Sequence, residues 1–442
     1  MSTTSTNKII TTGAAALVTG AMKSVHAAGS DIIKVGWLGC GGRGGGAIRQ
    51  CLAADPGTQV IACADLFEEK AMKGREGLNK DPKYKGRINI KDDHIFHGFD
   101  CHDKLAQTDC DLLVMATAPA FRGRQMLAAV KASKPKHIFT EKPVASDVAG
   151  CRLVLEASRI AKEKNLSIVC GTQRRHEFSR VALFDKIHSG AMGELVSGQC
   201  YWFGGGIWYR KGNPGMSELE WQCENWYHFT WLSGDQICEQ HIHNIDVMNW
   251  CFNGPPKKFM AVGGRATRDY SEAAKEVCKK FNNGSDANWE KYNGNIWDHL
   301  LGEMEYANGA RCTSFSGHGP GTGRGGEKLV GTKGVSDCNG SIKSHTGDVI
   351  WKYEGKNVNG QDQEHVDMLA GIRSGKLLNE GQRIAESTLT AIGLRTAAYT
   401  GKSFSWDWLL NASKQDLVPP QEKLKPGPGY FEPISTGADK LI

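Results

Sequence analysis

Short apolar runs alternate with helix-like segments through the first third of the chain. Such runs are typical of buried strands, and the segments between them place apolar residues on one helical face. Strands that alternate with helices form a parallel, doubly wound sheet. We therefore predict an α/β Rossmann domain over residues 31–172. Its strands are expected at residues 32–38, 60–64, 112–116, 137–140 and 167–170.

The pattern changes after this region. Strand-like runs now lie among turn signals such as Asn308-Gly309, which favours antiparallel pairing. We predict a second, α+β domain over residues 173–415, with a large, open, mainly antiparallel sheet. Its strands are expected at 196–203, 258–266, 299–306 and 311–315, and its helices at 236–250, 363–373 and 383–399. The proline-rich residues 416–442 are expected to form an extended tail on the surface.

The first 30 residues resemble a targeting signal. Lys8 precedes an apolar stretch of small residues, and Val25-His26-Ala27 offers a cleavage site of the A-x-A type. The apolar stretch is too short to anchor the chain in a bilayer. We expect export to the periplasm through a degenerate signal, with a disordered tail on a cytoplasmic protein as the alternative.

Charge and cysteine usage exclude several function classes. The net charge of +6 is dispersed along the chain, which argues against nucleic-acid binding. No other segment of the sequence is long and apolar enough to span a membrane. The 14 cysteines form no C-x-x-C pair, so neither a structural zinc site nor a dithiol centre is expected, and buried thiols are predicted instead. We expect a small-molecule ligand and no metal.

Glycine is over-represented, with 54 of 442 residues, and one cluster has a clear context. The G-x-G-x-x-G run from Gly39 to Gly44 follows a predicted strand and opens a helix, and Asp65 ends the next strand. This arrangement is typical of dinucleotide binding. Gly39 would form the turn, Gly41 would let the pyrophosphate approach, and Gly44 would allow close helix–strand packing. Gly42 and Arg43 belong to the same loop. Asp65 would bind the adenosine ribose, which favours NAD over NADP.

A second glycine-rich segment, residues 317–328, lacks the spacing of a phosphate-binding loop. We expect a flexible loop there.

Thr140-Glu141-Lys142-Pro143 ends a predicted strand, where ligands bind in doubly wound sheets. A lysine at that edge can lie beside a bound nicotinamide and exchange a proton with the substrate. On spacing alone, a surface lysine paired with Glu141 is the favoured interpretation.

A histidine-rich helix supplies a second candidate. On one helix, Glu239, His243 and Asp246 share a face, and a carboxylate beside a histidine suits general acid–base chemistry. A metal site through Glu239 and His243, or a structural histidine, are the alternatives. Aromatic residues nearby, including Trp226 and Tyr227, either grip a sugar ring or belong to the core.

These motifs, in this order, resemble the Gfo/Idh/MocA oxidoreductases over residues 32 to about 413. The resemblance implies that Lys142 is the catalytic lysine, His243 the catalytic histidine, and Asp246 the acid that follows it. Glu239 stands where most members have aspartate, which makes its partnership with His243 or Lys142 less secure. Gln173 and Arg174 match a substrate-facing segment, to which Trp226 and Tyr227 are added as substrate contacts. Thr117 and Pro119 match a turn near the nicotinamide, and Glu141 and Lys142 also lie at the cofactor.

The resemblance implies an NAD-dependent dehydrogenase of CH–OH groups in a sugar, cyclitol or sugar derivative. Some relatives are NAD-dependent glycosidases that oxidise, eliminate and reduce again, and this is the alternative. A sugar sensor that keeps the fold without catalysis ranks last. A homo-oligomer, dimer or tetramer, is expected through the open sheet.

Overall fold

The first sheet has six parallel strands in the order β3-β2-β1-β4-β5-β6. It belongs to a computed structural model that describes residues 32–319 and 323–431, so the signal-like residues 1–30 lie outside the described range. The strands are β1 (Ile33–Leu38), β2 (Thr58–Asp65), β3 (Ile95–His97), β4 (Leu112–Met115), β5 (His137–Thr140) and β6 (Ile168–Cys170). The doubly wound domain is confirmed. The short edge strand β3 was not predicted, because its residues are half-buried or exposed.

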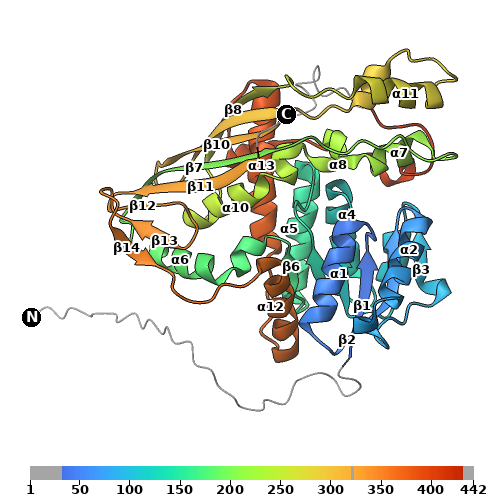
Figure 1. Ribbon diagram of the computed structural model, residues 1–442, viewed down its shortest axis with the longest axis horizontal. Helices are drawn as coiled ribbons and strands as arrows, with labels where there is room; N and C mark the ends of the chain where they lie inside the picture. The colour runs from blue at the N-terminus through green and yellow to red at the C-terminus, as the bar shows by residue number, and fades with distance from the viewer. Residues whose placement is uncertain (1–31, 320–322, 432–442) are drawn as a thin grey trace, which may run out of the picture.

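Helices cover both faces of this sheet, as Figure 1 shows. They are α1 (Gly42–Ala54), α2 (Glu68–Asn79), α3 (Cys101–Ala106), α4 (Pro119–Lys131) and α5 (Val148–Glu163). Strand β4 is buried throughout, which explains its continuous apolar run.

The second sheet has nine strands in the order β14-β13-β12-β11-β7-β10-β9-β8-β15. Among the described strands of this second sheet, only β7 and β10 pair in parallel, and the other neighbours are antiparallel. The mainly antiparallel sheet is therefore confirmed. Its strands are β7 (Leu195–Gly204), β8 (Lys258–Gly264), β9 (His299–Glu305), β10 (Arg311–His318), β11 (Arg324–Gly331), β12 (Val335–Ser336), β13 (Ser341–Lys343), β14 (Val349–Lys352) and β15 (Phe404–Ser405).

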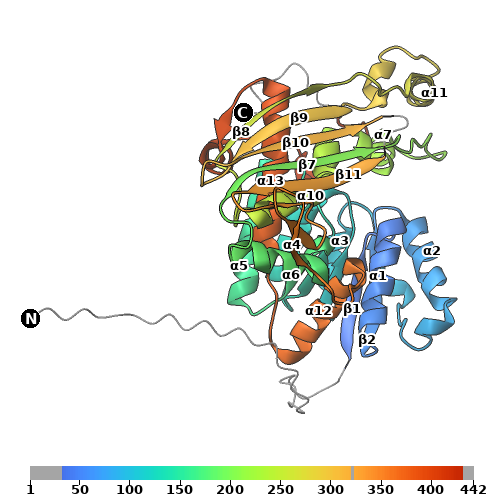
Figure 2. The same ribbon diagram turned by 60° about the vertical axis from the view of Figure 1, so that its left-hand side comes forward.

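One face of this sheet packs on helices and the other does not, as Figure 2 shows. Buried and exposed residues alternate along β8, where Phe259 is buried and Met260 exposed. The helices of this part are α6 (Phe178–His188), α7 (Glu218–Glu224), α8 (Thr230–Ser233), α9 (Gln236–Glu239), α10 (Ile242–Cys251), α11 (Ser271–Phe281), α12 (Gly360–Ser374) and α13 (Gly381–Thr400). No helix of the described ranges is long and apolar enough to cross a membrane.

The last two helices join the two sheets. Helix α13 lies between α5 and the second sheet, in both views (Figures 1 and 2). Helix α12 packs on α1, and Asn379 forms a parallel bridge with Ile168 at the edge of the first sheet. Residues late in the chain therefore reach the cofactor-binding domain.

Two local predictions are wrong. The helix expected over 236–250 is two helices, because the chain breaks at Gln240 and His241. The imidazole of His241 is buried and contacts the Ser314 hydroxyl of β10 at 2.8 Å, which turns the chain toward the sheet. In the glycine-rich segment, residues 317–318 end β10 and 324–328 belong to β11. Residues 320–322 of the expected loop lie outside the described ranges.

The cysteine prediction is confirmed. All 14 cysteines are buried and free, and they behave as small core residues.

Candidate active site

The glycine loop between β1 and α1 has the geometry that dinucleotide binding requires. Gly39 has φ +88°, and a side chain on it would lie within 3 Å of the Ala116 and Thr117 backbone. A Cβ on Gly44 would lie 1.8 Å from the Gly39 oxygen. Gly41 and Gly42 face open space, since a Cβ on either would have no atom within 4 Å. The loop therefore leaves the N-terminus of α1 free for a pyrophosphate.

Asp65 ends β2, as predicted, and both of its carboxylate oxygens already accept hydrogen bonds. One carboxylate oxygen accepts the Cys40 amide at 2.7 Å and the other accepts the Phe67 amide at 3.0 Å. Burial raises its pKa, although these two amides oppose the shift. Asp65 thus stabilises the glycine loop, and its carboxylate oxygens can each accept a further hydrogen bond from a ribose hydroxyl.

Two adjoining cavities follow the carboxyl ends of the strands. The nucleotide cavity, of about 150 Å³, is lined by Gly39, Gly41, Asp65 and neighbouring residues. The catalytic cavity, of about 330 Å³, is lined by Lys142, Glu239 and His243 among others. Both cavities are lined by Ala116, Thr117 and Trp226. An extended dinucleotide can therefore run from Asp65 past the glycine loop to Lys142.

Lys142 is held by Glu239. Its ammonium lies 3.2 Å from Glu239 Oε1 and also donates to the Glu239 carbonyl oxygen. Burial raises the pKa of Glu239, while Lys142 and Arg122 oppose the shift. The predicted surface pairing of Lys142 with Glu141 is not what the structure has, since only the Lys142 amide contacts that carboxylate.

His243 lines the same cavity without a carboxylate partner. Its Nδ1 is buried and has no hydrogen-bond partner among the described residues. Burial holds the pKa of His243 well below its usual range, and the charges of Lys142 and Arg174 lower it further. The imidazole is therefore neutral, and a neutral ring carries one nitrogen that can accept a hydrogen bond. The expected contact between Glu239 and His243 is replaced by the contact of Glu239 with Lys142, because the helix breaks between them.

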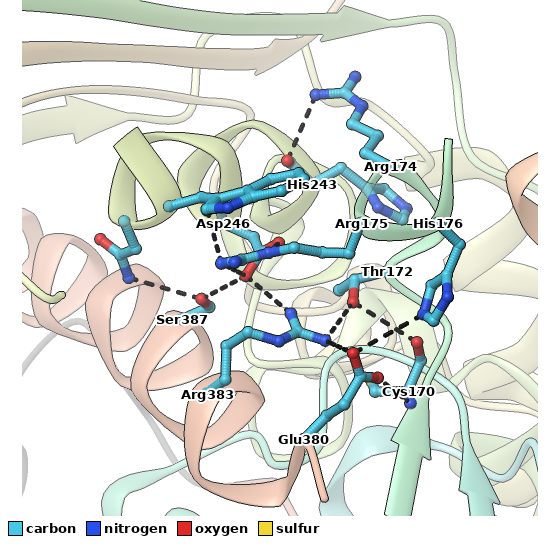
Figure 3. A network of polar contacts seen from close by, with 12 residues as sticks. Cys170, Thr172, Arg174, Arg175, His176, His243, Asp246, Glu380, Arg383 and Ser387 are labelled. Carbon is cyan, nitrogen blue, oxygen red and sulfur yellow. Dashed lines mark hydrogen bonds and ion pairs between the residues drawn. The ribbon is translucent and has the colours of Figure 1, made fainter. Parts of the chain in front are cut away.

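Asp246 lies away from the cavity, in the network that Figure 3 shows. Its carboxylate accepts two hydrogen bonds from Arg175, at 2.9 and 3.0 Å, and one each from Arg383 and the Ser387 hydroxyl. Burial alone would raise its pKa, but Arg175 and Arg383 hold it below the usual range. Asp246, predicted to contact the substrate, therefore does not line the catalytic cavity, and its contacts join α10 to α13.

The remaining predicted residues divide between the cavities and their surroundings. The catalytic cavity is lined by Arg43, Thr117, Glu141, Gln173 and Trp226. Of these remaining residues, three line neither cavity: Pro119, Arg174 and Tyr227. Arg174 pairs with Glu327 and donates to the His243 carbonyl oxygen at 3.3 Å, and the Tyr227 hydroxyl bonds to His318 at 2.9 Å.

Sequence reasoning missed several lining residues. Gln361 and Glu364 reach the catalytic cavity from α12, more than 200 residues after Lys142 in the chain, and no local pattern marks them. Neither carboxylate oxygen of Glu364 has a hydrogen-bond partner among the described residues. Burial and the nearby Glu141 raise its pKa well above its usual range. Arg122 and Gln240 also line this cavity, and their positions beside the Pro119 turn and Glu239 were the only sequence signals.

Comparisons with known proteins fit this geometry. Residues 33–170 match an oxidoreductase family with an NAD-binding Rossmann fold, and residues 182–335 match a GFO/IDH/MocA C-terminal domain. An inositol 2-dehydrogenase of Pseudomonas savastanoi pv. phaseolicola is 27% identical over 221 residues, 50% of this chain and 55% of that protein. A glycosyl hydrolase family 109 protein of Solibacter usitatus is 26% identical over 170 residues, 38% of this chain and 36% of that protein. The chain thus matches about half the length, or less, of these curated relatives.

Solved structures share the fold. The aldose-aldose oxidoreductase of Caulobacter crescentus has a TM-score of 0.61 and 16% identity, covering 85% of this chain and 99% of that one. The apo scyllo-inositol dehydrogenase of Lactobacillus casei has a TM-score of 0.59 and 16% identity, covering 85% and 98%.

Proposed function

The chain belongs to the GFO/IDH/MocA oxidoreductases with an NAD-binding Rossmann domain, and from this we propose that it oxidises a hydroxyl of an uncharged sugar or cyclitol with NAD. The observation that supports the proposal most is the meeting of Lys142, Glu239 and His243 in one cavity that adjoins the nucleotide cavity.

The charges of the catalytic cavity favour an uncharged substrate. Arg43 donates to Glu141, Lys142 to Glu239, and Arg122 to the backbone oxygens of Pro143 and Thr117. The guanidinium groups of Arg43 and Arg122 therefore already have partners and are poorly placed to neutralise a substrate carboxylate or phosphate. The amides of Gln173, Gln240 and Gln361 line the same space, and amides bind hydroxyl groups without requiring charge.

The proton chemistry falls to two residues. Neutral His243 accepts the proton of the substrate hydroxyl, and the ammonium of Lys142 stabilises the oxygen as negative charge develops on it. Glu239 keeps Lys142 in place through its carboxylate and its carbonyl oxygen. NAD, when bound, supplies the acceptor for the hydride.

A substrate panel tests the proposal. Neutral sugars, cyclitols, sugar acids and sugar phosphates are offered with NAD or NADP, and absorbance of the reduced cofactor is followed. We expect reduced cofactor with NAD and at least one neutral compound. Turnover confined to acidic or phosphorylated compounds would contradict the proposed substrate class, and turnover confined to NADP would contradict the role of Asp65.

NAD-dependent glycoside cleavage is the second candidate, and the glycosyl hydrolase family 109 relative favours it. Oxidation at C3 would acidify the C2–H bond, elimination would then expel the aglycone from C1, and after water adds to C1 the hydride would return to C3. Release of p-nitrophenol from p-nitrophenyl glycosides without net NADH formation would support this candidate over the dehydrogenase.

We also propose a homo-oligomer formed through the exposed face of the second sheet. Several apolar side chains lie on that face, including Met260 and Val262 of β8.

We further propose export through the signal-like residues 1–30. Cell fractionation with mass spectrometry of the N-terminus tests export, and a full-length cytoplasmic protein would contradict it.

A further inference from the structure

A C-terminal strap, residues 417–430, lies beside the nucleotide cavity and lines it through Gln421. Gln421 of this strap lines the cavity together with Asp65 of β2 and with Cys223 and Trp226 of the second part of the chain. In Figure 1 the strap is the red segment beside α7. It lies outside both family matches, which end at residues 170 and 335. Part of the lining of the nucleotide cavity therefore comes from residues outside the ranges that the family models match.

One end of the strap is fixed to the Rossmann domain. The Leu417 and Val418 amides donate to one carboxylate oxygen of Asp147, at 2.6 and 3.3 Å. Asp147 is the N-cap of α5. Next along the strap, the Pro419 carbonyl oxygen accepts from Arg124 at 3.2 Å, and Arg124 itself lines the nucleotide cavity.

The other end is fixed to α7. Gln222 accepts the Tyr430 amide at 2.6 Å and donates to the Tyr430 carbonyl oxygen at 2.9 Å. The Gly429 amide donates to Glu218 at 2.8 Å, and the Gly427 carbonyl oxygen accepts from the Leu219 amide at 3.1 Å. Gln421 lies between the two anchors and so is held over the cavity.

Apolar contacts also hold the strap, both at its first anchor and between the two anchors. Leu417, Val418 and Leu424 are all less than 10% exposed and belong to a core cluster with Trp221 and Trp231. Burial of a leucine side chain is worth about 1.5–3 kcal/mol, so the strap is a packed element of the fold.

We propose that this strap retains the dinucleotide: Gln421 binds the adenosine end, and the cofactor leaves only when the strap detaches. Adenosine offers ring nitrogens, an amino group and ribose hydroxyls, and a glutamine amide both donates and accepts. The proposal rests on the NAD-binding domain alone, so it does not depend on which substrate is oxidised.

Release of NADH from the full-length protein tests the strap. NADH is bound, chased with excess NAD, and its fluorescence is followed by stopped flow. Gln421→Ala removes the direct contact, and Leu424→Asp places a charge in the apolar anchor and detaches the strap. Lys425→Ala, an exposed residue of the same strap, is the matched control. Thermal melts without nucleotide establish that each variant is folded.

We expect Gln421→Ala to speed release about three- to tenfold, as for the loss of one hydrogen bond, and Leu424→Asp to speed it more than about tenfold. Lys425→Ala should release NADH at the wild-type rate. Should Leu424→Asp fail to fold, Gln421→Ala alone decides. Release within twofold of wild type in Gln421→Ala would overturn the proposal, even in a protein that oxidises its substrate as expected.

Discussion

At the scale of single residues, the arrangement of the catalytic cavity depends on which side chain Glu239 contacts. The carboxylate and the carbonyl oxygen of Glu239 both hold Lys142, so His243 has no carboxylate partner, and burial lowers the pKa of His243 and keeps the ring neutral. The sequence identified all three residues. It could not assign the pairing, because the break at Gln240 depends on His241 reaching β10, a contact between residues 73 positions apart.

Glu239→Gln tests the contact between the Glu239 carboxylate and Lys142. Glutamine keeps the shape and the carbonyl contact but removes the negative charge beside Lys142. We expect kcat to fall about tenfold to a hundredfold, within the range of general acid–base effects. Steady-state kinetics on the substrate found by the panel measure it, with the exposed Glu272→Gln on α11 as control. A kcat within twofold of wild type would show that the charge of Glu239 has no part in turnover.

At the scale of elements, the Rossmann loop was predictable because its requirements are local. The turn at Gly39 and the contact between Gly44 and Gly39 involve residues within one strand–helix unit. The network around Asp246 was not predictable. It brings together η3 (Gln173–His176), α10 and α13, and a pattern of residue spacing carries no information on such distant contacts.

Two alanine substitutions distinguish packing from open space in the loop. Gly44→Ala would place a methyl group 1.8 Å from the Gly39 oxygen, whereas the Gly42 position has nothing within 4 Å. Without nucleotide, we expect Gly44→Ala to lose about 2 kcal/mol or more of unfolding free energy and Gly42→Ala to lose almost none. Urea unfolding followed by circular dichroism measures both. Equal stability of the two variants would contradict the loop geometry.

The contacts of η3 with α12 and α13 predict a pH dependence of stability. Burial lowers the pKa of His176, but Asp367 at 2.6 Å and Glu380 raise it more, to about 9 from 6.5. A raised histidine pKa stabilises the fold fully below pH 6.5, and this contribution disappears as pH rises to about 9, by roughly 3 kcal/mol in all. We expect the urea midpoint of wild type to fall over that window.

His176→Gln should flatten the pH dependence, and the exposed His97→Gln should leave it as in wild type. An equally steep fall in His176→Gln would assign the effect to other groups.

At the scale of the whole molecule, the second sheet presents an unpaired apolar face. Met260 is 56% exposed and Val262 63%, and Leu301 of the neighbouring β9 is 42% exposed. Contiguous apolar surface of this kind is typical of association sites. The antiparallel sheet was predictable from strand-like runs that lie among turn signals. The strap was predicted as an extended tail, but its place over the nucleotide cavity depends on contacts with Asp147 and α7 that lie far away in the sequence.

A double variant tests the exposed face. Met260→Lys with Val262→Lys places two charges on β8, and we expect an oligomeric wild type to become monomeric. Light scattering coupled to gel filtration measures the mass, and Met72→Lys, at an exposed apolar position of α2, is the control. A monomeric wild type, or a double variant of unchanged mass, would contradict oligomerisation through this face.

The central claim is that Lys142 acts on the substrate while the dinucleotide is held independently of it. Lys142→Met keeps the volume of the side chain and removes its charge. Formation of NADH in a single turnover, with NAD and substrate saturating, measures the chemical step most directly. We predict a rate about 10²–10⁴-fold below wild type, with an NADH dissociation constant within about threefold of wild type. A single-turnover rate equal to that of wild type would contradict the claim.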